Sequence, residues 1–169
     1  MEVFQIQRAQ SLAVVASALD ATIPNWKTDA KDTAVWNMKK GQALTVAEIN
    51  ETEVKRTQIY AAVAEFFDVY DVMLLPAAQV PPFDLSQEWV DEIDGVTMDT
   101  YIDWMTVCCA ITVTGLPTTS MPGGFTPCGL PIGLQIVGKP RGDLDLLRIA
   151  HTFEQATQHG QRNPAIHAS

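Results

Sequence analysis

The stretch from Gly115 to Gly138, GLPTTSMPGGFTPCGLPIGLQIVG, constrains the fold of this chain more than any other. Glycine and proline favour special backbone conformations, so their clustering indicates tight turns between short extended segments. Thr118 to Met121 and Ile132 to Val137 are rich in strand-forming residues and lie between these turn formers. The sequence therefore predicts two core strands joined by a Gly/Pro-rich connection, with a break at Pro122-Gly123-Gly124.

The clearest helix is predicted from Val46 to Val69. Thr45 and Glu48 have the spacing of a capping box, in which the Thr hydroxyl accepts from the Glu amide and the Glu carboxylate accepts from the Thr amide. Glu51 and Lys55 are spaced for an i,i+4 ion pair. The apolar residues of this helix fall on one stripe, which we expect to be buried. That stripe consists of Ile59, Val63, Phe66, Phe67 and Tyr70.

Other periodic segments predict three further helices. We expect them over residues 3–19, 100–113 and 143–160, the last with Asp143 as its N-cap and Gly160 at its end. A helical turn is expected from Trp36, ended by Gly41. Residues 77–99 are expected to form an irregular acidic loop, and residues 161–169 a loose tail.

A short apolar run completes the predicted sheet. Val72 to Leu75 follows the long helix, is apolar throughout and ends before Pro76. Such a run predicts a strand buried on both faces, as in a parallel sheet. The order helix, strand, helix, strand, strand, helix indicates an α/β fold, in which helices cover a mixed β-sheet.

Composition and charge exclude several classes of protein. The 169 residues are 47% hydrophobic and 18% charged, which suits a folded domain with a real core. The net charge is -9 and no dense Lys/Arg cluster is present, so we expect no nucleic-acid binding. The longest uncharged run, residues 104–138, is interrupted by prolines and glycines and cannot form a membrane helix. Ser11 to Leu19 resembles a signal-peptide core, but its flanks favour a buried helix.

The cysteines and histidines indicate neither disulfides nor a metal. Three cysteines, two of them adjacent, make a poor disulfide framework and favour a reducing cytoplasm. His151, His159 and His167 recur evenly, but His167 follows Gly160 and Pro164, so the three cannot share one helix. No CxxC pair or histidine pair at ligand spacing suggests zinc. We expect no metal and no cofactor.

Three further groups of side chains could have a catalytic or metal-binding role. Ser120 and His151 could belong to a triad, but Ser120 lacks the Gly-x-Ser-x-Gly elbow that exposes a nucleophile. Cys108 or Cys109 could act with a histidine, although apolar surroundings raise a thiol's pKa and make it inert. The acidic residues of the 77–99 loop lack the Asp-x-Asp-x-Asp-Gly pattern of a calcium loop, so a solvated surface is expected. These residues are Asp84, Glu88, Asp91, Glu92, Asp94 and Asp99.

Several separated blocks resemble the amidase-signature family. They are Trp36 with residues 41–45 (GQALT), residues 70–76 (YDVMLLP), residues 114–117 (TGLP) with residues 121–125 (MPGGF), residues 129–138 (GLPIGLQIVG), and the helix from Asp143 to Glu154. The blocks occur in the family's order and spacing and extend over nearly the whole chain. The resemblance implies that residues 1–169 are the C-terminal portion of an amidase-signature domain.

The resemblance implies a hydrolase of C–N amide bonds in small amides, needing no metal. Its chemistry uses a nucleophilic Ser, a bridging Ser with a cis peptide and a neutral Lys, with backbone amides of a Gly/Ser-rich loop holding the oxyanion. In this chain no two serines are adjacent, and the only Gly-Gly is Gly123-Gly124. No lysine has a matching context. We therefore expect no catalytic residue in this chain.

The family's substrate pocket could still receive one wall from this segment. In such enzymes the helix before the Gly-Leu-Pro step borders the acyl side of the substrate. By position, this offers Tyr101, Trp104, Met105 and Cys108, although aromatic residues on a helix face are commonly core residues. Both interpretations stay open at this point.

Two hypotheses for function follow. In the first, the chain is part of an amidase and is inactive alone. In the second, it is a structural or interaction module that reuses half of an amidase fold. In either case, strand edges and apolar faces would be uncovered, which promotes pairing. We therefore expect a homo-oligomer, specifically a homodimer.

Overall fold

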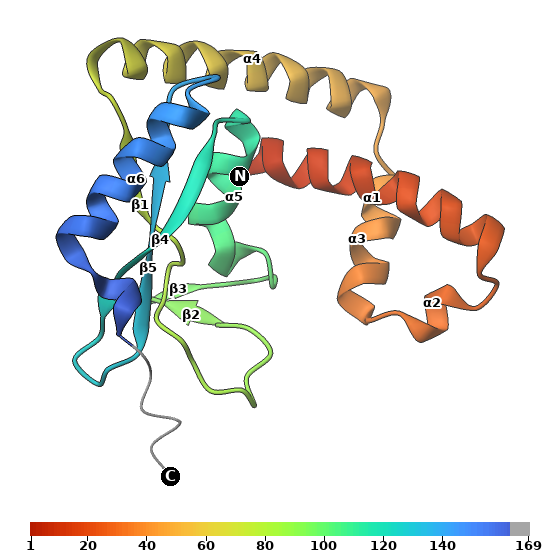
Figure 1. Ribbon diagram of the computed structural model, residues 1–169. Helices are drawn as coiled ribbons and strands as arrows, with labels where there is room; N and C mark the ends of the chain where they lie inside the picture. Colours follow the sequence, from red (N-terminus) through yellow and green to blue (C-terminus); the bar gives the residue numbers. More distant parts are fainter. Residues whose placement is uncertain (163–169) are drawn as a thin grey trace. The chain divides into compact units, whose positions relative to one another are not determined.

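The computed structural model describes residues 1–162, which pack as two compact units that divide between Val63 and Ala64 (Figure 1). The first unit contains α1 (Glu2–Thr22), α2 (Trp26–Asp29) and α3 (Asp32–Gln42). The helix α4 (Val46–Val69) begins in this unit and runs through the boundary. The predicted helices over residues 3–19 and 46–69 are confirmed.

The helix α3 corrects one prediction. It begins at Asp32 and contains Gly41, instead of being a single turn that Gly41 ends. A Cβ atom on Gly41 would lie 1.9 Å from the carbonyl oxygen of Ala9. Glycine is therefore required because the backbones of α1 and α3 approach each other closely here. The core of this unit is formed by α1, α2 and α3 and consists of Ala16, Trp26, Val35 and Met38.

The capping box predicted at the start of α4 is confirmed. The Thr45 amide donates to Glu48 Oε2 (2.8 Å), and the Glu48 amide donates to Thr45 Oγ1 (3.3 Å). The hydrogen bonds from the Thr45 amide and hydroxyl hold the pKa of Glu48 below its ordinary value. Lys55 forms the expected ion pair with Glu51 (2.9 Å). Of the predicted stripe, Phe67 is buried and Tyr70 is exposed.

The second unit contains a three-stranded sheet in the order β1-β5-β4. Its strands are β1 (Met73–Pro76), β4 (Thr118–Phe125) and β5 (Pro131–Val137). The α/β class is confirmed, but both of the pairings in this sheet are antiparallel. The prediction that β1 is a parallel strand buried on both faces is wrong. The strand pairs antiparallel with β5, and its residues alternate between half-buried and exposed. Leu74 is 56% exposed.

The two strands predicted within residues 115–138 are confirmed as an antiparallel hairpin. The expected break at Pro122-Gly123-Gly124 is wrong, since these residues lie inside β4. The pairing shifts between Pro122 and Gly124, which is a β-bulge, and Gly124 has a φ of 136°. The glycine thus permits an irregularity within the strand without ending it. The turn follows later, where the Thr126 amide donates to the Leu130 carbonyl (2.8 Å).

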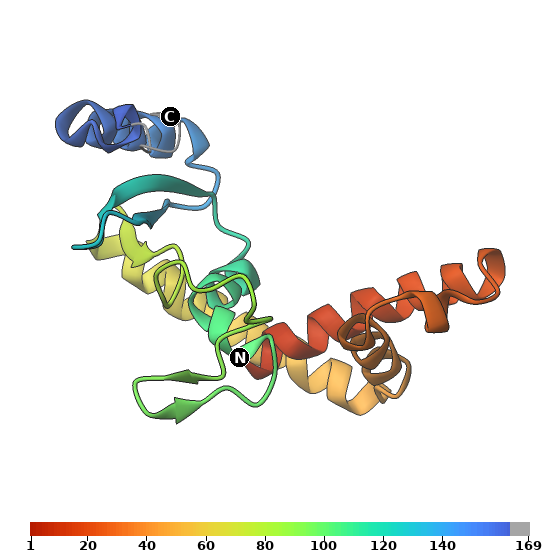
Figure 2. The same cartoon turned by 90° about the horizontal axis from the view of Figure 1, so that it is seen from below.

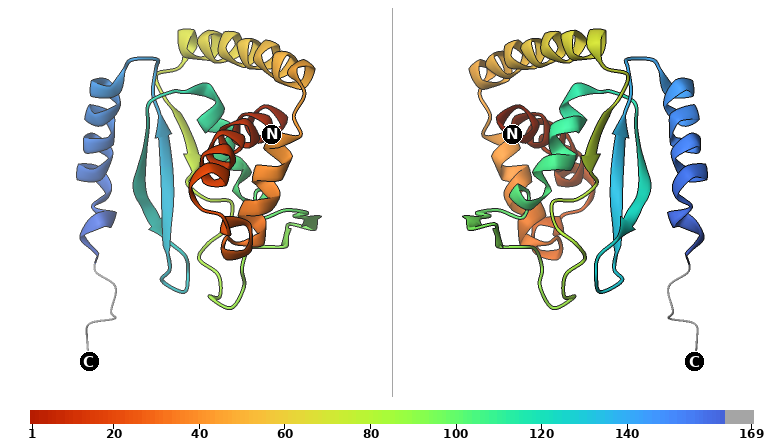
Figure 3. Two further views of the ribbon diagram at one scale, coloured as in Figure 1. Left: turned by 90° about the vertical axis from the view of Figure 1, so that its right-hand side faces the viewer. Right: turned by 90° about the vertical axis from the view of Figure 1, so that its left-hand side faces the viewer.

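Helices cover both faces of this sheet (Figure 3). One face packs on α6 (Asp143–Thr157) through a core centred on Ile136, Leu146 and Ala150. The other face is covered by α5 (Thr106–Thr114), which follows the short helix η1 (Asp103–Met105). Because a strand turns alternate side chains to opposite faces, its residues contribute to both layers.

The bounds of these helices differ slightly from the predicted ones. Before α5, the amide and hydroxyl of Thr100 both donate to Asp103 Oδ2 (2.8 Å each), so residues 100–102 form a turn. The N-cap of α6 is Gly142 and not Asp143, which is the first helical residue. The helix ends at Thr157, and the short helix η2 (His159–Gln161) contains Gly160. Residues 163–169 of the predicted tail lie outside the described residues.

The segment expected to be an irregular loop contains a small hairpin. Its strands are β2 (Glu92–Ile93) and β3 (Val96–Thr97), and it extends away from the three-stranded sheet (Figure 2). Asp94 and Gly95 join the strands with φ values of 49° and 77°. An Asp-Gly pair with positive φ at both residues is a strong hairpin signal that our sequence analysis overlooked. Across residues 1–162, the helices are too short or too polar to cross a membrane.

Candidate substrate cleft

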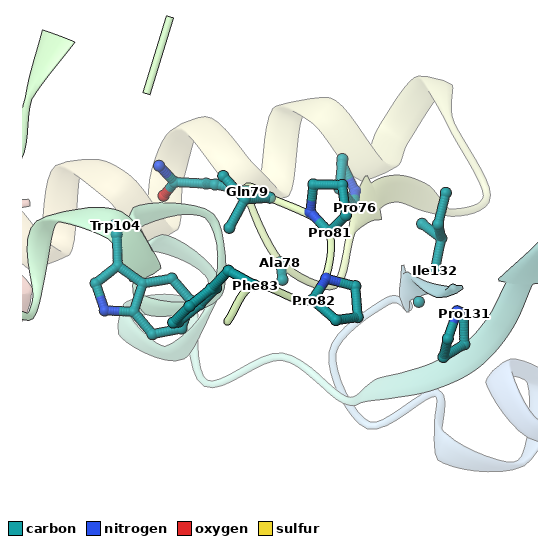
Figure 4. A pocket seen from close by; sticks show the side chains of 11 residues that line it. Pro76, Ala78, Gln79, Pro81, Pro82, Phe83, Trp104, Pro131 and Ile132 are labelled. Atoms are coloured by element: carbon teal, nitrogen blue, oxygen red, sulfur yellow. The ribbon is translucent and has the colours of Figure 1, made fainter. Parts of the chain in front are cut away.

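A cleft of about 470 Å³ lies where β1 ends and β5 begins (Figure 4). We call it the proline cleft. Phe83 and Trp104 lie at one end, Pro131 and Ile132 at the other, and Pro81 and Pro82 between them. Its lining comes from the end of β1, the loop that follows, η1 and the start of β5. The lining residues are Pro76, Ala78, Gln79, Val80, Pro81, Pro82, Phe83, Trp104, Pro131, Ile132 and Gly133.

The aromatic end of the cleft has a defined geometry. The rings of Phe83 and Trp104 meet edge to face, with centroids 5.5 Å apart and planes at 89°. This arrangement is favoured because the positive edge of one ring meets the negative face of the other. The pair joins the loop after β1 to η1 and gives the cleft a firm aromatic wall.

The loop that forms the cleft is held by hydrogen bonds of its backbone and by one that the side chain of Gln79 accepts. The Ala77 amide donates to the Gly133 carbonyl (2.9 Å), and the Cys108 thiol donates to the Ala77 carbonyl (2.7 Å). Gln79 Oε1 accepts from the Val107 amide in the first turn of α5 (2.9 Å). These bonds connect the loop to β5 on one side and to α5 on the other.

A buried side chain supports the end of β1 in the same way. Gln135 is 7% exposed, and its Nε2 donates to the carbonyl of Pro76 (3.1 Å). Burying an amide is costly unless it is hydrogen-bonded, and this bond provides the compensation. Gly133 is also constrained, because a Cβ there would lie 2.7 Å from the Cβ of Ala77. The start of β5 therefore approaches the loop as closely as the atoms permit.

The structure distributes the four predicted wall residues over different surroundings. Trp104 lines the proline cleft. Tyr101 is half-buried and faces Trp89, with ring centroids 6.5 Å apart. Met105 is half-buried outside the lining of the cleft, and Cys108 acts through its bond to Ala77. That these four residues border a substrate stays a prediction.

Sequence analysis did not identify most of the cleft. Phe83 and Gln79 lie in a segment expected to be an irregular acidic loop, and Pro131 was considered only as a turn former. The run Pro81-Pro82-Phe83 was the available signal, since an apolar run within a polar loop marks a buried or binding surface. Gln135 gave no signal, because its position inside an apolar strand does not reveal its partner.

The sheet separates Ser120 from His151, the two residues considered above as members of a catalytic triad. Met121 packs with α6 in the core described above, so its neighbour Ser120 points to the opposite face. His151 is an exposed residue of α6. Ser120 and His151 are therefore not brought together.

The three cysteines lie in different environments, and no disulfide bond joins them. Cys109 is buried, whereas Cys108 is half-buried. Cys128 is exposed in the hairpin connection, where its hydrogen bond with Thr126 (Sγ to Oγ1, 3.0 Å) holds the thiol pKa below its ordinary value. None of these thiols lines the proline cleft.

Within residues 1–162, no three His, Cys, Asp or Glu side chains gather in a group that could hold a metal ion. In the acidic loop, Asp84 instead accepts hydrogen bonds from the hydroxyl (2.7 Å) and the amide (2.8 Å) of Ser86. The hydrogen bond from this hydroxyl is the main reason that the pKa of Asp84 is lowered. His167 lies outside the described residues.

Comparison with solved structures defines the class of fold. A bacterial aryl acylamidase of the amidase-signature enzymes matches 94% of this chain with a TM-score of 0.76 and 23% identity. A 6-aminohexanoate cyclic dimer hydrolase matches 97% of it with a TM-score of 0.72 and 18% identity. The chain covers 33% and 36% of those two proteins. At these identities the likeness establishes the amidase-signature fold.

The sequence comparisons establish the family. The family model described as Amidase matches residues 4–147, and the chain belongs to the amidase family. Over 111 residues, the chain is 35% identical to a glutamyl-tRNA(Gln) amidotransferase subunit from Dehalococcoides mccartyi (strain CBDB1). It is 40% identical over 111 residues to the protein of the same description from Myxococcus xanthus (strain DK1622). These matches cover 66% of this chain but only 21% and 22% of the relatives, so it corresponds to a small part of them.

Proposed function

We propose that this chain is the C-terminal portion of an amidase that hydrolyses C–N bonds in small amides, and that it is inactive alone. The observation that carries the proposal is the family match over residues 4–147 in a chain that covers only 21% of a curated relative. The adjacent serines and the Gly/Ser-rich loop that the family's chemistry requires have no counterpart in its sequence. In this proposal the chain supplies scaffold and one wall of the substrate pocket.

The proline cleft is the part of the chain that suits this role best. Substrate pockets are concave and mostly apolar, and they range from about 300 to about 1,000 Å³. The cleft has a volume of about 470 Å³, and Trp104 in its wall is one of the residues expected to border the acyl side. The three cysteines form no disulfide bond, which is consistent with a reducing cytoplasm as the place of action.

The purified chain is expected to hydrolyse acetanilide and glutamine no faster than buffer does. A serine-reactive fluorophosphonate probe should label no residue, because Ser120 points away from α6, the helix that carries His151, so this imidazole cannot activate the serine hydroxyl. Mass spectrometry of the probe-treated chain is the measurement. Labelling of one serine that disappears in Ser120→Ala would contradict the proposal and identify the nucleophile.

The second candidate function is a non-catalytic interaction module, and the exposed edge of β1 favours it. β1 pairs only with β5 in the described sheet, and Leu74 on it is 56% exposed. Reading the DNA directly upstream would distinguish the two functions. An in-frame segment resembling Gly-Gly-Ser-Ser-Gly-Gly supports the amidase portion, and a stop codon there supports the module.

In both proposals the chain forms a homodimer through the β1 edge, since an unpaired apolar edge favours strand pairing. Replacing Leu74 with lysine is expected to weaken dimerisation by about ten-fold, because pairing would bury an ammonium group at the interface. Sedimentation equilibrium measures the effect. The matched control is Leu85→Lys, at a fully exposed leucine in the loop after β1, which should leave dimerisation unchanged. A wild-type chain that stays monomeric at high concentration would refute the dimer.

A further inference from the structure

We propose that the proline cleft binds the uncharged aryl or alkyl group on one side of an amide bond, and that Trp104 and Phe83 determine this specificity. The inference rests on the proposed function, because a cleft for half of an amide is useful only in an amidase. It goes further by naming the chemical class of the group that enters and the two side chains that select it.

The lining of the cleft carries no charged side chain. None of the residues that form the cleft is acidic or basic, and their polar side-chain groups are the amide of Gln79 and the indole N–H of Trp104. The side-chain oxygen of Gln79 already accepts from the Val107 amide. A carboxylate or an ammonium group entering the cleft would lose hydration without gaining a counter-ion, which is strongly unfavourable. Uncharged groups meet no such penalty.

Aromatic and proline rings form much of the wall of the cleft. The edge-to-face pair of Phe83 and Trp104 presents aromatic surface at one end, and Pro81, Pro82 and Pro131 present rigid rings along the rest (Figure 4). An aromatic ring placed against such a wall gains contact area and favourable ring–ring geometry. Proline side chains also lose little conformational entropy when a ligand orders them.

Hydrogen bonds hold the walls of the cleft in place before a ligand arrives. Ala77 is bonded to Gly133 and Cys108, and Gln79 is bonded to the first turn of α5. Binding a ligand therefore does not require the loop to be ordered at the same time. A preformed cleft retains more of the binding energy that contact with an apolar group supplies.

The test is ligand binding by the whole chain, followed by NMR of the tryptophan indole N–H groups. Three ligands share one ring and differ in charge: acetanilide is neutral, benzoate is anionic and benzylamine is cationic. Acetanilide is expected to shift the Trp104 resonance with saturation. Benzoate and benzylamine are expected to bind at least about ten-fold more weakly, a difference of about 1.4 kcal/mol.

Three variants locate the binding site. Trp104→Ala should weaken acetanilide binding by about ten-fold. Trp89→Ala is the matched control, since Trp89 faces Tyr101 outside the cleft, and it should leave the affinity unchanged. Ile132→Lys places a cation in the lining at a residue that is 41% exposed, and it should strengthen benzoate binding by about ten-fold.

Three results of these binding experiments would contradict the inference. Equal binding of the three ligands, or equal effects of Trp104→Ala and Trp89→Ala, would overturn the inference. Acetanilide binding that appears only when the protein is diluted to a monomer would also overturn it, because a second copy would then be the occupant. The readout involves no hydrolysis, so a labelled serine would refute the proposed function and leave the binding result intact.

Discussion

Replacing Ile136 with alanine is expected to lower the free energy of unfolding of the unit that begins at Ala64 by about 3 kcal/mol. Ile136 is 1% exposed at the centre of β5, where it packs on Leu146 and Ala150 of α6. Truncation removes buried methyl groups and leaves a cavity that the sheet and helix cannot close. Native-state hydrogen exchange of the β5 amides measures the loss for this unit separately.

Ile132→Ala is the matched control for this prediction. It removes the same atoms from the same strand, but Ile132 is 41% exposed. Its cost should be much smaller, because most of its side chain is already in contact with water. Equal losses for the two variants would mean that α6 does not form the core with β5.

Replacing Gly41 with alanine is expected to destabilise the unit from Met1 to Val63 by about 3 kcal/mol. In a helix interior, alanine is normally more favourable than glycine by about 1 kcal/mol. Intrinsic helix propensity therefore predicts that the Gly41→Ala substitution stabilises the unit. The contact decides the outcome, since the new Cβ would lie 1.9 Å from the Ala9 carbonyl oxygen and 2.7 Å from its carbon. Backbone atoms in the middle of α1 cannot yield as a flexible side chain can. Circular dichroism during thermal unfolding measures the change.

Two further variants test the reason for this effect. Lys39→Ala, at an exposed position of the same helix, should change the stability by less than about 0.5 kcal/mol. Adding Ala9→Gly to the Gly41→Ala variant should restore little, because the obstruction is the backbone of Ala9 and not its methyl group. Full restoration would show that the helices do not approach through their backbones.

The elements that could be predicted from sequence are those whose signals are local. The bounds of α4 follow from its capping box and its apolar residues, and the β4–β5 hairpin follows from glycine and proline placed around strand-forming residues. The pairing of β1 could not be predicted in this way. An apolar run of a few residues looks the same in a parallel and an antiparallel sheet, because the difference lies in a partner far along the chain.

The candidate site could be predicted only in part for the same reason. Trp104 was found because the family resemblance pointed to the segment before the Gly-Leu-Pro step. Gln79 and Phe83 were not found, since their importance comes from contacts with Val107 and Trp104 across a gap of about twenty residues or more. Loop residues of this kind acquire their role through tertiary contacts, which a local pattern does not record.

The bonds that hold the loop after β1 have a consequence for how specificity can change. The contacts of Ala77 with Gly133 and Cys108 use the main-chain atoms of Ala77, which every amino acid except proline possesses. Residues 80–82 follow this anchored point and line the cleft, whereas Phe83 also joins the loop to η1 through its ring contact with Trp104. The main-chain bonds of Ala77 thus hold the loop in place, whereas the side chains of residues 80–82 contact a ligand. A library that varies residues 80–82 alone can therefore explore new ligands on an unchanged scaffold.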